Sequence, residues 1–166
     1  MTQDWDGEWD WKSLYDRMKF ERLKVGENDD GKTLRIEFKY FLEYLVYNQD
    51  DSPLYLFEGA LERHGTSLLK DFKVPKYFKE DLFSLVGEKA RPPYRWFLVG
   101  PRRSGSSLHK DPLGTSAWNT SLKGHKLWFF IEPHTNKYDA FGKKFRKKGE
   151  DTEAIHYYAL RVPRMV

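Results

Sequence analysis

The chain has 166 residues, a formal net charge of +4 and no cysteine. Without cysteine it can form no disulfide, no zinc–thiolate cluster and no thiol nucleophile, and its 17% aromatic content argues against disorder. The first twelve residues are acidic and contain no apolar stretch, and an apolar run of about 18 residues occurs nowhere, so we expect neither a signal peptide nor a membrane-spanning helix.

Local periodicity predicts a helix, a hairpin and a second helix at the start of the chain. Trp11, Leu14 and Met18 recur at helical spacing, whereas residues 23–38 alternate on either side of a turn. The predicted elements are a helix over about 11–20, two strands within 23–38, a helix over 39–48, a strand over 53–58 and short helices over 67–72 and 76–86.

The second half of the chain is predicted to contain closely spaced strands. Residues 94–101 are typical of a buried strand that ends at Gly100 and Pro101. Three further strands are predicted over 106–112, 117–122 and 126–133. Because helices come first and short strands later, we expect a mainly β fold with N-terminal helices, of the α+β class, with its strands in a sandwich or barrel.

A histidine and an aspartate stand two positions apart in the stretch SSLHKDPLGTSAWN. On a strand, His109 and Asp111 would point to the same face, and Lys110 to the other. An imidazole nitrogen and a carboxylate oxygen on one strand suit a non-haem Fe(II) centre made of two histidines and one carboxylate. An ordinary surface strand with a charged pair is the alternative, because so short a motif also occurs by chance.

Longer motifs surround this pair. They are RPPYRWF, GPRRSG, HKDPLGTSAWN and GHKLW, with DDSPLY, KVPKYF and DLF further upstream. Together they resemble the Jumonji-C family of Fe(II)- and 2-oxoglutarate-dependent oxygenases, and within it the branch of bifunctional arginine demethylases and lysyl hydroxylases. The resemblance is collinear from about Trp11 to Pro133, with a small deletion near residues 58–67, and continues weakly over residues 153–164.

The resemblance implies a fold and a domain division. Members of the family have a double-stranded β-helix, a cupin-like jelly roll, and we expect a partial one here that lacks its last strands. Residues 1–62 would form an N-terminal helical and strand region, and residues 63–166 the N-terminal, incomplete part of a Jumonji-C domain.

The resemblance also implies roles for individual residues. His109 and Asp111 would be two of three iron ligands, and Lys126, in GHK, would bind the distal carboxylate of 2-oxoglutarate. A buried carboxylate needs a cation beside it, and lysine supplies a compact one. A solvated surface lysine is the alternative for Lys126.

Three more residues match positions of the family's co-substrate site. Ser106, where the family usually has threonine, and Tyr55 would offer hydroxyl groups to the same carboxylate, and Asn119 would lie near the metal and the co-substrate. The alternatives are a turn residue for Ser106, a core residue for Tyr55 and a strand cap for Asn119.

The family's third iron ligand, a second histidine in a context rich in Pro, Gly and Trp, has no match in the sequence. His125 belongs to the GHK motif, His134 lies in a predicted turn, and His156 lies on a predicted strand and could act as a substitute ligand. We therefore expect a fragment or truncated gene model of a larger oxygenase, inactive by itself. A degenerate relative that has lost catalysis is the alternative.

Three functions follow as hypotheses. The first is an oxygenase that acts on lysine or methylarginine side chains with Fe(II) and 2-oxoglutarate, with ascorbate left open as a further cofactor. The second is a catalytically inactive Jumonji-C-like binding module. The third is a nucleic-acid binder that uses KKFRKKG, residues 143–149, although such a run is more often a solvated loop.

The resemblance further implies partners and a location. It suggests protein substrates such as histone tails and splicing-factor-like proteins, the role of a chromatin regulator and a place in the nucleus, and it leaves RNA open as a partner. We expect no membrane partner. An incompletely closed barrel would expose unpaired strand edges, so we also expect self-association through them.

Overall fold

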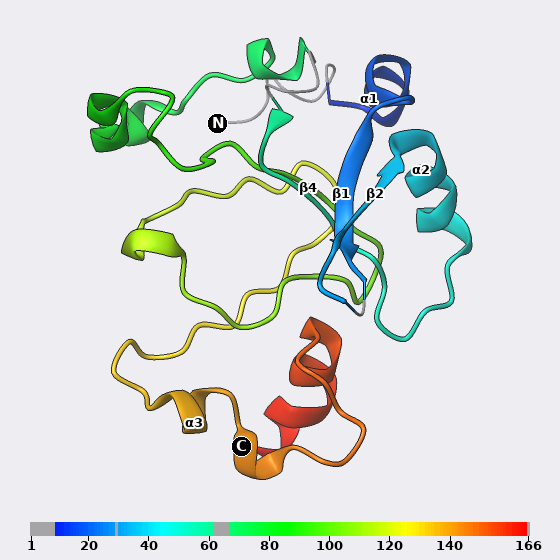
Figure 1. The fold of residues 1–166 in the computed structure, drawn as a ribbon, viewed down its shortest axis with the longest axis vertical. Helices are drawn as coiled ribbons and strands as arrows, with labels where there is room; N and C mark the ends of the chain where they lie inside the picture. The colour runs from blue at the N-terminus through cyan, green and yellow to red at the C-terminus, as the bar shows by residue number, and fades with distance from the viewer. Residues whose placement is uncertain (1–8, 29, 62–66, 166) are drawn as a thin grey trace. The chain divides into compact units, whose positions relative to one another are not determined.

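The structure, a computed structural model, describes residues 9–28, 30–61 and 67–165 (Figure 1). The chain forms two compact units. The first consists of Met1–Tyr47 and Leu56–Val99, and the second of Asn48–Tyr55 and Gly100–Val166. The division into residues 1–62 and 63–166 expected from the sequence stays a prediction.

The first unit begins with the predicted helix, α1 (Trp11–Met18). Asp10 caps it, because its carboxylate accepts hydrogen bonds from the backbone N–H groups of Lys12 and Ser13 at 2.8 and 3.0 Å. Leu14 and Met18 are buried on one side of the helix. The apolar spacing in the sequence therefore marks the buried face correctly.

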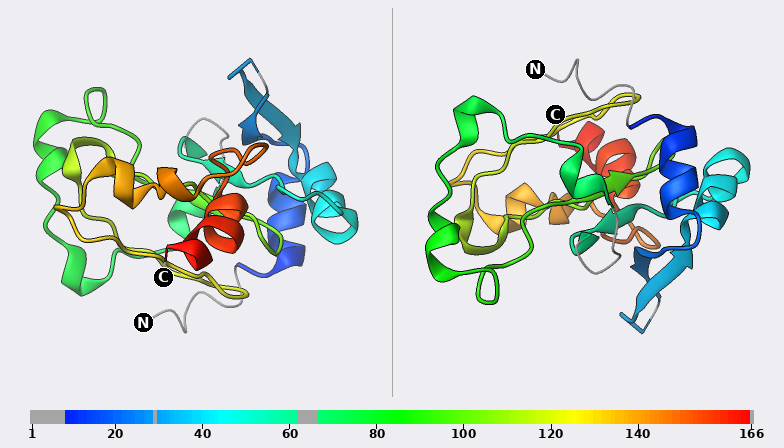
Figure 2. Two further views of the ribbon diagram at one scale, coloured as in Figure 1. Left: turned by 90° about the horizontal axis from the view of Figure 1, so that it is seen from below. Right: turned by 90° about the horizontal axis from the view of Figure 1, so that it is seen from above.

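The predicted hairpin and second helix are also confirmed. Strands β1 (Arg22–Glu27) and β2 (Thr33–Glu37) pair antiparallel with an irregularity between Lys24 and Gly26, and α2 (Phe38–Tyr47) follows directly. Helix α1 lies beside α2 (Figure 2), and α2 also contacts β2. Phe38 and Phe41 are the buried residues of α2.

A second antiparallel pair, β3 (Leu56–Glu58) and β4 (Phe97–Val99), completes the strands of the described residues. Between them the predicted short helices occur as 3₁₀ turns, namely Ser67–Lys70, Lys76–Phe78 and Leu82–Val86. The Phe97 ring lies 6.0 Å from that of Trp9 and 6.2 Å from that of Phe38, so β4 contributes to the same aromatic core as α2.

A buried carboxylate joins β3 to the hairpin of the first unit. Glu58 is 2% exposed and accepts hydrogen bonds from the Arg35 guanidinium at 2.7 Å and from the backbone N–H groups of Lys24 and Ala60 at 3.2 and 3.0 Å. Burial by itself raises the pKa of this carboxyl, but the hydrogen bonds from these three residues outweigh it and lower the pKa overall.

The second unit ends in a group of short helices. These are α3 (Lys137–Ala140), a 3₁₀ turn over Lys143–Phe145, a π-helical stretch over His156–Arg161 and a 3₁₀ turn over Val162–Arg164. Arg161 is 2% exposed and donates to the carbonyl oxygens of Phe141 and Asp151 at 3.1 and 2.8 Å. One buried guanidinium thus connects three segments of this region.

The strands predicted over 106–112, 117–122 and 126–133 are wrong. Along the described stretch from residue 100 to residue 133, backbone hydrogen bonds close only local turns, such as Gly114 N–H to Asp111 O at 3.1 Å, and no strand is present. A strand needs a neighbour that accepts and donates along its whole length, and these segments have none. Antiparallel strand pairs and helices are thus present, whereas a jelly roll is not confirmed.

The strand predicted around His156 is also wrong, because this residue begins the π-helical stretch. Ala154, Tyr157 and Arg161 are the buried residues here, at a helical spacing that the sequence analysis overlooked. His134 lies in a turn, as predicted. None of the helices in the described part of the chain has both the length and the apolar character needed to span a membrane.

Replacing Glu58 by glutamine should destabilise the fold at neutral pH by about 1–3 kcal/mol, because Arg35 loses the charge of its buried partner. The pKa of Glu58 is lowered by folding, so its stabilising contribution is present above the unfolded-state pKa of about 4.3 and is lost as the pH falls through the folded-state value. Denaturant unfolding of both proteins at pH 7 and pH 3 should therefore show a difference that shrinks in acid.

Glu27→Gln is the matched control for this measurement. Glu27 is also paired with a cation, Lys24 at 2.9 Å, but its side chain is 55% exposed. Exposed pairs of this kind contribute little, so the control should unfold like the wild type. An equal loss in both variants would contradict the assigned role of Glu58.

Candidate functional site

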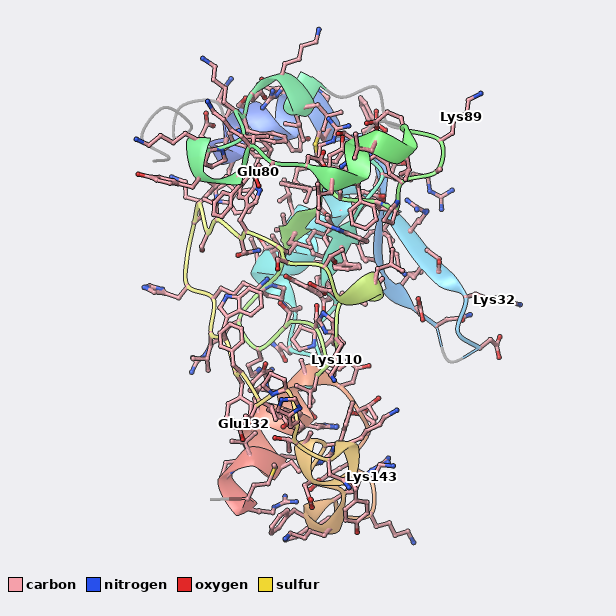
Figure 3. The ribbon with its side chains drawn as sticks, turned by 90° about the vertical axis from the view of Figure 1, so that its left-hand side faces the viewer. Lys32, Glu80, Lys89, Lys110, Glu132 and Lys143 are labelled. Carbon is pink, nitrogen blue, oxygen red and sulfur yellow. The ribbon has the colours of Figure 1, made fainter. Side chains whose placement is uncertain are left out.

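The candidate metal ligands lie in the second unit, in a turn rather than on a strand. Asp111 directly precedes Pro112, which holds it extended with φ −63° and ψ 145°, and a 3₁₀ turn follows over Pro112–Gly114. The carboxylate of Asp111 makes no capping hydrogen bond to this turn. Its Oδ1 instead lies 3.3 Å from Nε2 of His109. Lys110, which stands between these two residues in the sequence, is labelled in Figure 3.

The other ring nitrogen of His109 is held by the backbone. Nδ1 lies 2.7 Å from the carbonyl oxygen of Ser107, and since a carbonyl can only accept, Nδ1 carries the proton of this hydrogen bond. In the neutral ring Nε2 is then a bare acceptor. Histidine ligands of metal ions typically have this arrangement, in which the second nitrogen donates to a carbonyl or a carboxylate.

The pair leaves a place for a cation. A neutral Nε2 and an ionised Oδ1 are both acceptors, so their approach to 3.3 Å is favourable only with a proton or a metal ion between them. Two donor atoms about 2.1 Å from one ion, at a right angle, are about 3.0 Å apart. The observed separation therefore fits neighbouring ligands of one metal ion. Both side chains are exposed, which leaves access from solvent.

A third ligand is not brought to this pair within the described residues. Residues 9–28, 30–61 and 67–165 contain no group of three or more histidine and acidic side chains that could hold a metal ion. His156, the candidate for a substitute ligand, has its Nδ1 2.6 Å from Oδ1 of Asp151 instead. The absence of a third ligand from the chain stays a prediction.

Tyr55 and Lys126, the residues assigned to the co-substrate carboxylate, do meet. The Lys126 ammonium donates a hydrogen bond of 3.3 Å to the Tyr55 hydroxyl, although the residues are 71 positions apart. Burial disfavours the charged form of each group. It therefore raises the pKa of Tyr55 and lowers the pKa of Lys126. Lys126 is exposed as a whole residue, and only its surroundings near the ammonium are apolar.

Trp128 is a member of this site that the sequence analysis missed. The Lys126 ammonium lies 4.8 Å from the centre of the Trp128 ring, and this ring stacks on Phe130 at 5.6 Å. The ring of Phe129 instead lies 6.1 Å from Tyr157 and 6.2 Å from Tyr158. The alternation Lys126, Trp128, Phe130 was the available signal, because alternate residues of an extended segment share a face.

Ser106 and Asn119 are not brought into contact with either pair. Both are exposed, and within the described residues neither side chain makes a hydrogen bond or an ion pair. Their roles therefore rest on the resemblance alone and stay predictions.

The basic run 143–149 is partly used inside the second unit. Its central arginine, Arg146, donates from Nε to the carbonyl oxygen of Glu150 at 2.7 Å. Burial by itself raises the pKa of Glu150, but hydrogen bonds from Arg164 and the Lys147 backbone, with the charges of Arg164 and Arg161, lower it overall. A role in RNA binding stays a prediction.

Comparison with known proteins decides the family. No protein-family model matches the chain. It is 46% identical over 138 residues to the bifunctional arginine demethylase and lysyl-hydroxylase psr-1 of Caenorhabditis briggsae, which covers 81% of this chain and 35% of the relative. The chain belongs to the Jumonji-C family.

Two further relatives agree. The psr-1 protein of Caenorhabditis elegans is 45% identical over 137 residues, covering 80% of this chain and 34% of the relative. A fly protein, the 2-oxoglutarate and iron-dependent oxygenase JMJD4 homolog of Drosophila melanogaster, is 36% identical over 63 residues, covering 37% of this chain and 15% of the relative. The chain spans about a third of the length of the two psr-1 relatives.

The pKa of Lys126 should lie below the ordinary lysine value of about 10.4, because burial near Tyr55 and Trp128 disfavours the charged form. The measurement is NMR of the chain after ¹³C-reductive methylation of its lysines, with the resonance assigned by its loss in Lys126→Arg. A Lys126 resonance that titrates at or above the ordinary value would show that its surroundings are solvated.

Proposed function

We propose that the chain carries metal- and co-substrate-binding residues of an Fe(II)- and 2-oxoglutarate-dependent protein oxygenase that acts on lysine or methylarginine side chains. The names of the psr-1 relatives and of the fly oxygenase support this activity. The observation that carries the proposal is the approach of His109 Nε2 to Asp111 Oδ1, with Nδ1 held by a backbone carbonyl.

When bound, Fe(II) with 2-oxoglutarate and dioxygen supplies the oxidation of an unactivated C–H bond, which no protein side chain can perform. His109 and Asp111 would hold the ion through one nitrogen and one oxygen, and the Asp111 charge would partly neutralise it. The hydrogen bond from His109 to Ser107 fixes the ring so that Nε2 keeps its orientation before any ion arrives.

Lys126 and Tyr55 would bind the distal carboxylate of 2-oxoglutarate. The ammonium supplies the opposite charge, and the raised pKa of Tyr55 keeps its hydroxyl protonated, so the phenol can donate to an oxygen of the ligand. The ring of Trp128, on which Phe130 stacks, lies beside the ammonium and shields it from water on that side. A charge in such surroundings binds an anion more strongly than one in bulk water.

The proposal extends to the substrates and the location that the resemblance implies. We propose lysine and methylarginine side chains of nuclear proteins, such as histone tails or splicing-factor-like proteins, with ascorbate as an additional reductant. Hydroxylation of a lysine carbon leaves a stable alcohol, whereas hydroxylation of an N-methyl group releases formaldehyde. The same site could therefore give either product, depending on which carbon the bound substrate presents.

Removing the Asp111 carboxylate should weaken metal binding. We expect Asp111→Ala to lower Mn(II) affinity about tenfold or more, since even changes to outer-shell partners of metal ligands typically cost 10- to 100-fold. Titration of the chain with Mn(II), followed by paramagnetic broadening of the His109 ring resonances, measures it. Equal Mn(II) affinity of the wild type and Asp111→Ala would refute the metal assignment.

Asp151→Ala provides the matched control, because Asp151 is another carboxylate of the second unit that contacts a histidine ring, at 2.6 Å from His156 Nδ1. Mn(II) affinity should not change in this variant. A loss as large as that of Asp111→Ala would instead identify His156 and Asp151 as metal ligands.

Lys126→Ala should weaken the binding of 2-oxoglutarate while leaving Mn(II) affinity unchanged. A hydrogen bond to a charged group contributes about 1.5–3 kcal/mol, and the partial exposure of Lys126 places the expected loss at about tenfold to a hundredfold. Lys126→Arg should also bind poorly, since a planar guanidinium does not replace the compact ammonium beside Tyr55. Calorimetric titrations with 2-oxoglutarate and with Mn(II), done separately, test both statements.

The outcomes separate the proposed oxygenase from an inactive binding module. Binding of 2-oxoglutarate without binding of Mn(II) would favour the module. Unchanged binding of 2-oxoglutarate by Lys126→Ala would show that the GHK motif has only a structural role.

A further inference from the structure

The backbone of Arg103 has a left-handed conformation that residues other than glycine rarely adopt. Its φ is 75°, and among the described residues only Leu113 is another non-glycine residue with positive φ. The Cβ of an L-residue is sterically disfavoured there, and glycine is the residue that usually takes this position. Gly105 lies two positions further in the same loop, yet an arginine occupies the left-handed position. A residue kept in such a conformation generally has a contact that stabilises it.

The Arg103 side chain makes that contact. Its Nη2 donates to the backbone carbonyl oxygen of Asp50 at 2.5 Å, and its Nη1 lies 3.9 Å from the carboxylate of Asp51. Through these two contacts, Arg103 connects the loop after β4 to the segment Asn48–Tyr55 that precedes β3. Both segments belong to the second unit.

The far end of that segment is Tyr55, and it packs against the same loop. A Cβ added at Gly100 would lie 2.6 Å from Cδ2 of Tyr55 and would overlap the Ser104 hydroxyl. The absence of a side chain at Gly100 thus makes room for the Tyr55 ring. The segment 48–55 is held at its start by Arg103 and at its end by the close approach of Tyr55 to Gly100.

We propose that Arg103 is a positioning residue for the co-substrate site: it clamps residues 48–55 so that the Tyr55 hydroxyl meets the Lys126 ammonium. Arg103 itself touches neither of these groups in any described contact, and acts through the backbone of Asp50. The link to 2-oxoglutarate rests on the function proposed above, whereas the link to Tyr55 does not.

The chain offers a matched pair of variants for a test. Arg103→Gly permits the left-handed backbone, which glycine adopts readily, and removes the clamp. Arg102→Gly places the same flexible residue one position earlier, where the exposed arginine makes no ion pair or hydrogen bond within the described residues. Arg103→Lys retains one charged donor that can reach the Asp50 carbonyl oxygen.

The first measurement follows Tyr55 directly. The 166-residue chain is labelled with 3-fluorotyrosine, and the Tyr55 ¹⁹F resonance is assigned by its loss in Tyr55→Phe. We expect Arg103→Gly to shift or broaden this resonance, Arg102→Gly to leave it in place and Arg103→Lys to restore it in part. An unchanged Tyr55 resonance in Arg103→Gly, or the same change in Arg102→Gly, would overturn the proposal.

The second measurement is calorimetric titration with 2-oxoglutarate and, separately, with Mn(II). Arg103→Gly should weaken 2-oxoglutarate binding about tenfold and leave Mn(II) affinity as in the wild type, because the His109 and Asp111 pair has no described contact with Arg103. If the wild type binds no 2-oxoglutarate while Arg103→Gly still moves the Tyr55 resonance, the clamp stands and the proposed function fails. If the wild type binds 2-oxoglutarate and Arg103→Gly binds it equally well, positioning by Arg103 is refuted.

Discussion

The close approach of Tyr55 to Gly100 is the contact on which the candidate co-substrate site depends. In the sequence these two residues stand directly before β3 and directly after β4, two strands of three residues each that pair antiparallel in the first unit. A tyrosine ring fits there only because Gly100 has no side chain. The Tyr55 hydroxyl then has a fixed position against which Lys126 can place its ammonium. So short a pairing needs support, and the buried Glu58 at the end of β3 provides it through Arg35 and two backbone N–H groups.

The two candidate pairs favour ligands of opposite charge. His109 and Asp111 bring two acceptors together in an exposed turn, so they favour a cation. Lys126 and Tyr55 bring an ammonium and a phenol hydroxyl together, with the Trp128 ring beside the ammonium, so they favour an anion. The function proposed above needs a ligand with a metal-chelating end and a carboxylate at the other end. This division of charge is a physical reason why a keto dicarboxylate bound to a metal ion suits these residues.

The sequence predicted correctly those elements whose hydrophobic periodicity is visible within a few residues. Helix α1 and the β1–β2 hairpin are of this kind, since Leu14, Met18 and the turn before β2 reveal them locally. The strands expected between residues 106 and 133 failed for the opposite reason. The side chains do alternate there, since Trp128 and Phe129 contact different partners. This alternation indicates only which side chains share a face. Whether a backbone finds a strand to pair with depends on distant parts of the chain.

The site shows the same limit of prediction. The proximity of His109 to Asp111 follows from their spacing in the sequence, and it survives although they lie in a turn rather than on a strand. The meeting of Tyr55 and Lys126 was reached only through the family resemblance, because no local pattern joins residues 71 positions apart. The clamp of Arg103 was not predicted at all. Its acceptor is a backbone carbonyl, which every residue possesses, so no residue type at position 50 could have indicated the contact. Residues that position a site through the backbone therefore have to be found in the structure.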